Sequence, residues 1–273
     1  MLICELLKIV MKKDLQNELS EFALELAKAS EKQTLAHFRQ SVTIDNKLNE
    51  GFDPVTEGDK GAERIMRAMI EEKYPDHSIH GEEYGIKQGN SPFNWVLDPI
   101  DGTRSFIAGM TSWTTLIGLE FESEPVIGVM HQPYVGETFV GTPSEAYVLR
   151  NGEKRSLKVN PAANLSQAFG TTTGPDTTFD TPEKRQFLNN LRSNLRNIRY
   201  DGDAYFFSLL AAGHVDIAID AGLQAYDIFA LVPIIRGAGG IVTTWDGGPA
   251  HEGGDILAAA SQDLYDQARA LMN

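Results

Sequence analysis

Residues 95–103 of this 273-residue chain read Trp-Val-Leu-Asp-Pro-Ile-Asp-Gly-Thr. The apolar start of the stretch predicts a buried strand, and the proline predicts a sharp turn after it. Asp98 and Asp101 flank this turn, so both carboxylates can point into one cavity, where they would repel each other unless a cation lay between them. If a helix begins at Gly102 and Thr103, their backbone N–H groups can face an anion. The stretch therefore predicts a cation site and a phosphate site in one corner, although Asp-Pro and Asp-Gly also occur in ordinary turns.

Acidic residues recur at three other places that local patterns put at the ends of helices or strands. Glu82 lies in Gly81-Glu82-Glu83, after a short segment that follows a helix. Asp227 lies in Ala225-Tyr226-Asp227, which opens an apolar helix that we expect to run to Gly239-Gly240. Asp59 enters a helix whose apolar positions repeat with helical spacing. These positions are Ala62, Ile65, Met66, Met69 and Ile70.

The chain resembles the lithium-sensitive, magnesium-dependent sugar-phosphatase superfamily typified by inositol monophosphatase. The resemblance rests on four blocks whose order and spacing also match, and it covers nearly the whole chain from about residue 15. The blocks are Pro-Val-Thr-x-x-Asp at residues 54–59, Gly-Glu-Glu at 81–83, Asp-Pro-Ile-Asp-Gly-Thr at 98–103, and Tyr-Asp followed by Ala-Gly-Gly between residues 226 and 240. The resemblance implies a phosphate-monoester hydrolase with the layered αβαβα sandwich of that superfamily, an α+β or α/β fold.

The resemblance also implies a centre of two or three Mg2+ ions that lithium inhibits. Mg2+ takes oxygen ligands and keeps several waters, and two cations about 3.5–4 Å apart can deprotonate a water and hold the leaving oxygen. Glu82 would hold the first ion and Asp98 would bridge two. The full expected ligand set is Glu82, Asp98, Asp101, Asp227 and the main-chain carbonyl of Ile100.

Three residues resemble the family's catalytic groups. Thr103 matches a hydroxyl that orients the attacking water together with a carboxylate. Because this hydroxyl cannot be the base at neutral pH, we assign activation of the water to the metal and Glu82, with Thr103 as a relay. Asp59 corresponds to the acid that supports Thr103 and reaches a weaker metal through water. Lys47 matches a lysine near that weaker site only loosely, and a solvated side chain explains it better. Asp101, Gly102 and Thr103 are assigned to substrate binding.

The charge of the chain limits its partners. With a formal net charge of −14 and a pI near 4.8, its mean field repels phosphate, so we expect neither nucleic acid nor an anionic membrane as a partner. A small phosphorylated metabolite would then need the local positive charge of bound cations. Cys4 is the only cysteine, which excludes an intramolecular disulfide and suits a reducing compartment. We expect a cytoplasmic protein, homodimeric as the resemblance implies, for which Met11 offers an alternative start.

The two halves of the sequence, residues 1–160 and 161–273, differ in pattern. The first begins with a helix from about Asp14 to Arg39 and a polar loop over residues 42–53, and it continues as antiparallel strands and carries most metal ligands. The second alternates helices and strands and supplies Asp227 and the specificity residues. The expected strands are Thr115–Phe121, Val126–His131, Glu137–Gly141, Ala146–Arg150, Leu157–Val159, Val215–Asp220 and Ile241–Trp245, and two further helices are expected from Pro182 and over Ala204–Ala212.

Finer motifs resemble the histidinol-phosphate phosphatase branch of the superfamily. Asp203 and Asp220 stand where inositol phosphatases commonly have less acidic or longer residues. Because histidinol phosphate carries an ammonium group and a titratable imidazole, additional carboxylates would pair with its cations. We therefore expect Asp203 and Asp220 to bind substrate. The motifs of this branch are Thr103–Gly109, Thr115–Leu119, Val129–Pro133, Gly202–Tyr205 and Leu210–Asp216.

Two alternatives stay open. One is another phosphatase of the same fold, which acts on inositol 1-phosphate, a sugar bisphosphate or a 3′-phosphonucleotide. The other is a metal-dependent binding or regulatory protein that has lost catalysis. Such a loss would show as a missing metal ligand or a missing Thr103, and all of these residues are present.

Overall fold

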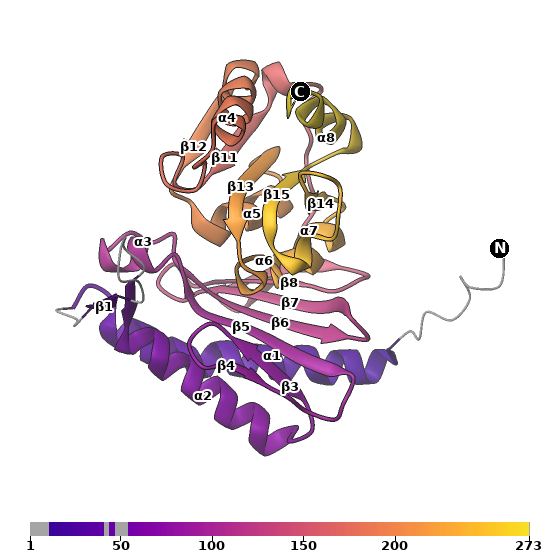
Figure 1. Cartoon of the computed structure of the whole chain (residues 1–273). Helices are drawn as coiled ribbons and strands as arrows, with labels where there is room; N and C mark the ends of the chain where they lie inside the picture. Colours follow the sequence, from indigo (N-terminus) through magenta and orange to yellow (C-terminus); the bar gives the residue numbers. More distant parts are fainter. Residues whose placement is uncertain (1–10, 41–43, 47–53, 273) are drawn as a thin grey trace.

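The computed structural model of the chain describes residues 11–40, 44–46 and 54–272. Layers of helices alternate with two sheets, which confirms the expected mixed α and β sandwich (Figure 1). Among the described residues, no helix is both long and apolar enough to cross a membrane. The three helical layers consist of α1 (Lys13–His37) with α2 (Glu57–Lys73), then α5 (Asp203–Ala211), α6 (Ala225–Ile228) and α7 (Leu231–Gly237), and finally α4 (Pro182–Asn194) with α8 (Gln262–Arg269).

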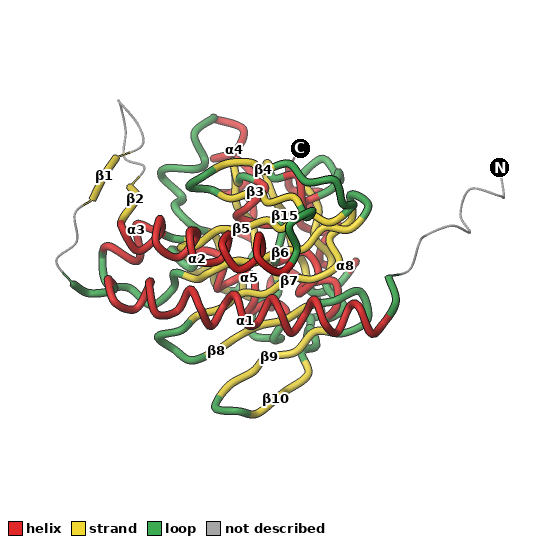
Figure 2. The backbone as a smooth tube through the Cα atoms, turned by 90° about the horizontal axis from the view of Figure 1, so that it is seen from below, coloured by secondary structure: helices red, strands yellow, loops and turns green. Residues whose placement is uncertain are grey.

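The first helical layer covers one face of the larger sheet, and its two helices lie side by side (Figure 2). α1 confirms the helix expected from about Asp14 to Arg39. α2 starts with a capping box, in which the side chains of Thr56 and Asp59 each accept a backbone N–H of the first turn. The apolar spacing expected in α2 is also confirmed. The core between these helices and the sheet includes Leu19, Phe22, Leu26, Met66, Ile70, Trp95, Leu97, Ile117 and Val129.

The larger sheet has eight strands in the order β10-β9-β8-β7-β6-β5-β3-β4. Only β3 and β5 run parallel, so the expected antiparallel meander is confirmed from β5 to β10. The strands are β3 (Ser78–Gly81), β4 (Gly85–Lys87), β5 (Phe93–Asp101), β6 (Thr114–Phe121), β7 (Glu124–Gln132), β8 (Glu137–Gly141), β9 (Ala146–Arg150) and β10 (Glu153–Ser156).

The smaller sheet has five strands in the order β12-β11-β13-β15-β14. The helices α5 and α7 pack between the two sheets, and α4 and α8 cover the outer face. The helix expected from Pro182 is confirmed, and the Thr181 side chain caps it by accepting from Lys184 N. The strands are β11 (Phe169–Thr172), β12 (Asn197–Tyr200), β13 (Ile217–Leu223), β14 (Ile241–Thr244) and β15 (Gly254–Ala259).

Two expected segments near the first sheet are wrong. The polar loop expected over residues 42–53 contains β1 (Ile44–Asn46), which pairs antiparallel with β2 (Pro54–Thr56), while residues 42, 43 and 47–53 lie outside the described part. Leu157–Val159 is not a strand. Instead the turn at Asn151-Gly152, where φ is 52° and 80°, folds β10 back directly onto β9 with Glu153 opposite Arg150.

The single long helix expected from Ala225 to Gly240 is also wrong, because it is divided into α6 and α7. Pro233 lies in the first turn of α7. A proline has no N–H to donate to the carbonyl four residues earlier, here that of Phe229, so the helical hydrogen bonds stop between the two segments. The short α6 that results carries Asp227 in its first turn.

Candidate metal and phosphate site

Asp98 and Asp101 lie on one side of β5 because the strand is bulged between them. In a regular strand, residues three apart point to opposite faces. Here Asp98 and Asp101 pair with β6 residues that are only two apart, so β5 contains one extra residue over this interval. The extra residue brings both carboxylates to the same side. The sharp turn expected at the proline is therefore wrong: Pro99 lies inside the bulge, and its carbonyl accepts from the hydroxyl of Thr115 (2.8 Å).

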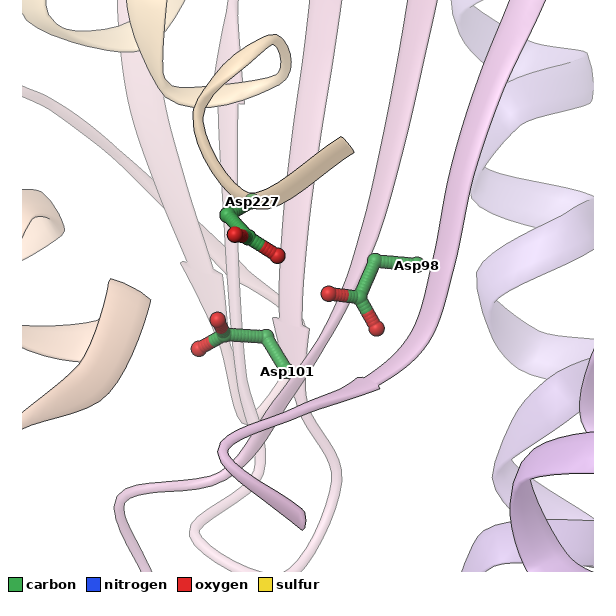
Figure 3. Close-up of side chains that lie close together, drawn as sticks. All are labelled: Asp98, Asp101 and Asp227. Atoms are coloured by element: carbon green, nitrogen blue, oxygen red, sulfur yellow. The ribbon is translucent and has the colours of Figure 1, made fainter. Parts of the chain in front are cut away.

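The third carboxylate comes from the helical layer between the sheets. Asp227 lies in the first turn of α6, where its Oδ2 accepts from the N–H of Gln224 (2.7 Å). Figure 3 shows the side chains of Asp98, Asp101 and Asp227 close together. Each offers an oxygen, and these oxygens all lie within 4.8 Å of one another. Within residues 11–40, 44–46 and 54–272, no other three acidic, histidine or cysteine side chains converge in this way.

This convergence is electrostatically unfavourable without a cation. Burial raises the pKa of Asp98 well above its ordinary value, and the nearby carboxylates of Glu82, Asp101 and Asp227 raise it further. Burial also raises the pKa of Asp101, with Asp203 and Asp227 as the next largest causes. A divalent cation between the oxygens would stabilise the ionised forms. Because carboxylate oxygens are the hard ligands that suit Mg2+, the residues present fit the metal that the resemblance implies.

Glu82 lies directly after β3 and beside Asp98. In the parallel pair of β3 and β5, Gly81 is opposite Leu97, and the N–H of Glu82 donates to the Leu97 carbonyl (3.2 Å). The Glu82 carboxyl hydrogen-bonds with that of Asp98 and thereby contributes to the raised pKa of Asp98. Glu82 is outside the group of three converging carboxylates, but this contact places it at the edge of the same site.

Thr103 connects the bulge to α2. It is the first residue of α3 (Thr103–Ile107), and its hydroxyl lies 3.1 Å from the Ile100 carbonyl and 3.4 Å from Oδ1 of Asp59. Oδ2 of Asp59 accepts from both the N–H and the hydroxyl of Thr56, at 2.8 and 2.5 Å. Asp59 is fully buried, and this burial raises its pKa to about 6. The structure thus brings together three groups that the sequence analysis singled out, namely Thr103, Asp59 and the Ile100 carbonyl.

Gly102 lies where the start of α3 meets the start of α5. Its φ is 78°, and a Cβ at this position would lie 2.6 Å from the carboxyl carbon of Asp203, so only glycine fits. Oδ2 of Asp203 accepts from the hydroxyls of Ser105 (2.6 Å) and Ser112 (2.8 Å). The backbone N–H that follows Asp203 donates to Oδ2 of Asp101 (2.7 Å). The expected phosphate-binding turn is therefore held against the second half of the chain.

Asp220 lies in β13 and is bound to the loop that follows β11. Its side chain accepts from Thr173 N (3.2 Å) and from the hydroxyl of Thr178 (3.4 Å). The Thr173 hydroxyl in turn accepts from Asp203 N (3.0 Å), so one residue joins both acidic groups. Burial raises the pKa of Asp220 to about 8. Contact of Asp203 and Asp220 with a substrate stays a prediction, and Lys47 lies outside the described residues.

Two side chains that position the site were not expected from the sequence. Glu63 is fully buried and accepts from backbone N–H groups directly after Glu82. It lies four residues after Asp59 in the same helix, and this spacing is a signal that could have revealed it. Thr173 has no such signal, because its partners Asp203 and Asp220 are 30 and 47 residues away.

Comparisons with known proteins agree on one family. The profile of the inositol monophosphatase family matches residues 15–272. The chain is 37% identical to the chloroplastic bifunctional phosphatase IMPL2 of Arabidopsis thaliana, over 92% of this chain and 75% of that protein. It is 32% identical to the histidinol-phosphatase of Chlorobaculum parvum, over 89% of this chain and 92% of that protein. A solved inositol monophosphatase from Zymomonas mobilis superposes with a TM-score of 0.82 at 35% identity, covering 94% of this chain and 98% of that chain.

Proposed function

This chain belongs to the inositol monophosphatase family and is therefore a phosphate-monoester hydrolase, and we propose that its substrate is histidinol phosphate. The family is metal-dependent, and the acidic cluster of Asp98, Asp101 and Asp227 can bind a metal ion. We propose that this metal is Mg2+, bound as two or three ions, and that lithium inhibits the enzyme.

On this proposal, the carboxylates of Glu82, Asp98, Asp101 and Asp227 and the Ile100 carbonyl hold the metal. Bound Mg2+ supplies positive charge that offsets the phosphate and makes an attached water more acidic. The raised pKa values of Asp98 and Asp101 support this role, because their ionised forms lack a compensating cation in the protein alone. Asp101 is assigned to both the metal and the phosphate-binding turn.

Thr103 and Glu82 are the groups that we assign to the attacking water. The Thr103 hydroxyl has one proton, which it can donate to the Ile100 carbonyl or to Asp59, at 3.1 and 3.4 Å. Its remaining lone pairs can then accept a hydrogen bond from the water and orient it. Glu82 would take up the proton that the water loses. The buried Asp59, fixed by Thr56, would keep the Thr103 hydroxyl in place.

The phosphate group of the substrate would lie at the start of α3. The first N–H groups of a helix have no partner within the helix, so those of Gly102 and Thr103 can bind an anion. The hydrogen bond from α5 to Asp101 and the packing of Asp203 on Gly102 fix this turn. Phosphoryl transfer depends mainly on positioning and charge stabilisation, which a fixed turn beside bound cations provides.

The choice of substrate rests on a second pair of acidic residues beside this turn, Asp203 and Asp220. Asp203 and Asp220 are joined through Thr173 and lie close enough for Asp203 to raise the pKa of Asp220. A substrate with an ammonium or imidazolium group would stabilise these carboxylates, whereas neutral inositol would not. An ionised carboxylate has about four acceptor positions, so its bonds within the protein do not prevent a further one to the substrate.

A substrate panel tests the proposal. Phosphate release is measured with histidinol phosphate, inositol 1-phosphate and a 3′-phosphonucleotide, each with Mg2+ and with a chelator. We expect the highest kcat/KM for histidinol phosphate, and no release from any substrate in the chelator. Faster hydrolysis of inositol 1-phosphate would contradict the choice of substrate but not the metal-dependent reaction.

Inositol 1-phosphate is the second candidate, and the similarity to the Zymomonas mobilis inositol monophosphatase favours it. The same panel separates the two candidates. If histidinol phosphate is the substrate, the enzyme acts in histidine biosynthesis. A cytoplasmic location and a homodimer stay predictions, which fractionation and light scattering would check.

A further inference from the structure

A buried ion pair in α2 lies directly under the segment that carries Glu82. Glu63 is fully buried, and its Oε1 accepts from Nε of Arg67 one turn further along the helix (2.7 Å). The Arg67 side chain is itself only 13% exposed. Neither residue belongs to the metal ligands or to the catalytic groups proposed above.

The pair binds the backbone on the far side of Glu82. Oε2 of Glu63 accepts from Glu83 N (2.7 Å), and Oε1 also accepts from Tyr84 N (3.2 Å). Arg67 Nη2 donates to the carbonyl of Gly85. Glu63 and Arg67 therefore bind the three consecutive residues that follow Glu82.

Gly81, the residue before Glu82, packs directly against the same ion pair. A Cβ on Gly81 would lie 2.0 Å from Oε1 of Glu63 and 2.8 Å from Nη2 of Arg67, so the backbone touches both side chains here. On the opposite side, Glu82 N donates to Leu97 O (3.2 Å), one residue before Asp98. The Glu82 segment is thus held between the ion pair and β5.

Stability alone does not account for this arrangement. A buried ion pair loses much of its Coulombic gain to desolvation, and a well-packed apolar pair is often as stable. Apolar side chains could not accept hydrogen bonds from the N–H groups of Glu83 and Tyr84. These two residues lie where the chain reverses between β3 and β4. Buried N–H groups need an acceptor, and a carboxylate provides two oxygens for them.

The same face of α2 also contacts Thr103, the other residue that we assign to the attacking water. Asp59 and Glu63 are four residues apart in α2, so they lie on one face, one turn apart. Asp59 contacts the Thr103 hydroxyl, and Glu63 binds the residues that follow Glu82. α2 therefore sets the position of Thr103 relative to Glu82.

We propose that the Glu63–Arg67 pair is a positioning site for Glu82, which aims this carboxylate at Asp98 and so sets the affinity of the site for Mg2+. The inference rests on the metal-dependent reaction proposed above and is independent of the identity of the substrate. Residues that orient metal ligands typically change metal affinity by about 10- to 100-fold when they are replaced.

The test uses Glu63→Gln in the full chain. Glutamine has the same shape but only one oxygen, so it cannot accept all three hydrogen bonds from Arg67 Nε, Glu83 N and Tyr84 N. Calorimetric titration with Mg2+ in the absence of substrate should show an affinity reduced about tenfold or more. The Mg2+ concentration for half-maximal phosphate release should rise in parallel, while KM at saturating Mg2+ changes less than the metal affinity.

Met66→Ala is the matched control. Met66 is fully buried in the same helix, but it packs in the apolar core beneath the sheet. The control should lower Tm and leave the Mg2+ affinity within about twofold of the unmodified protein. If Glu63 had a purely structural role, Glu63→Gln would likewise lower Tm and leave the Mg2+ affinity within about twofold. That result would overturn the proposal. An equal loss of Mg2+ affinity in Met66→Ala would also overturn it.

Gly81→Ala provides a second route if Glu63→Gln fails to fold. The added methyl group pushes against Glu63 without removing any charge, so the Mg2+ affinity should again fall. Unchanged affinity in folded Gly81→Ala would contradict the proposal. If the unmodified protein prefers another phosphoester, only the choice of substrate fails. If it binds no divalent cation, both the metal-dependent reaction and this inference are wrong.

Discussion

Two acidic regions meet at Gly102, and they differ in what satisfies their carboxylates. In the metal corner, defined here as Asp98, Asp101 and Asp227, the side chains lie close together, and backbone N–H groups fix one oxygen of each. In the recognition region, defined as Asp203 and Asp220, the carboxylates accept from serine and threonine hydroxyls and from the loop after β11. The first arrangement gathers charge for a cation, whereas the second uses carboxyl oxygens as hydrogen-bond acceptors for a loop.

This difference teaches which carboxylates must be ionised for the chemistry. An amide can replace a carboxylate that accepts its side-chain hydrogen bonds through one oxygen only, as Asp203 does, because it keeps the shape and one acceptor oxygen. It cannot replace a carboxylate whose charge offsets a divalent cation. Isosteric Asp→Asn changes should therefore separate the two regions, and the predictions below are ordered from the largest effect to the smallest.

The largest effect is expected for Asp101→Asn. Without the charge of Asp101 the metal corner should bind Mg2+ poorly, so kcat/KM for histidinol phosphate should fall about a thousandfold or more. Asp203→Asn is the matched control in the recognition region, where a loss of roughly ten- to a hundredfold is expected. Steady-state phosphate release measures both. Near-normal turnover in Asp101→Asn would reduce Asp101 to a turn residue, and equal losses in the two variants would remove the distinction between the regions.

Thr103→Ala should lower kcat far more than it weakens substrate binding. The N–H groups of Gly102 and Thr103 remain in this variant, so phosphate binding persists while the water loses its orienting hydroxyl. A loss of about 10²- to 10³-fold in kcat is expected, with a small change in KM. Thr103→Ser keeps the hydroxyl and should restore most of the rate. A raised KM with unchanged kcat would show that Thr103 only binds phosphate.

Asp220→Asn tests whether the recognition region contacts the substrate. A charge-assisted hydrogen bond contributes about 1.5–3 kcal/mol, so KM for histidinol phosphate should rise roughly ten- to a hundredfold. Glycerol phosphate has no cationic group, and its KM should barely change. Equal losses for the two esters would mean that Asp220 acts only through the loop that Thr173 and Thr178 anchor.

The smallest effect concerns pH and stability without metal. The pKa of Asp220 is raised to about 8 in the folded chain, from about 3.9 for an unfolded aspartate. Between these values the folded state binds the proton more tightly, so the stability that Asp220 contributes at low pH is lost as pH rises toward 8. The burial of Asp59 acts in the same direction up to about pH 6.

Thermal unfolding in chelator should therefore show a Tm that falls between pH 5 and 8, and Asp220→Asn should reduce this fall by roughly 3–10 °C. Added Mg2+ should raise Tm through the metal corner without removing the contribution of Asp220. A pH dependence identical in the variant and the unmodified chain would show that Asp220 does not titrate in this range.

The sequence predicted the residues of the metal corner better than their geometry. The motif at residues 98–103 indicated a shared site, but residues three apart in a strand face opposite ways, and only the bulge reverses this. The bulge depends on the pairing of β5 with β6, and no local sequence pattern predicts the register of that pairing. In contrast, the division of the helix after Asp227 follows from Pro233, which was visible in the sequence.

Contacts between distant segments could not be predicted. Ser105 and Asp203 are 98 residues apart, and Ala204 and Asp101 are 103 apart, so the junction of the two regions exists only in the folded chain. Strands β11, β12 and β15 were not expected either, because they are short and lie inside a layered structure without clear alternation. Helices were predicted better: α1 and α2 follow from their apolar spacing, and the start of α4 follows from its capping Thr181 and from Pro182.

Calorimetric titration of Mg2+ into the unmodified chain, Asp101→Asn and Asp203→Asn is the most direct measurement of the difference between the two regions. It needs no substrate and so does not depend on the choice of histidinol phosphate. We expect the unmodified chain and Asp203→Asn to bind Mg2+ with similar affinity, and Asp101→Asn to lose this binding. Binding of Mg2+ to Asp101→Asn with unchanged affinity and stoichiometry would contradict the assignment of the metal corner.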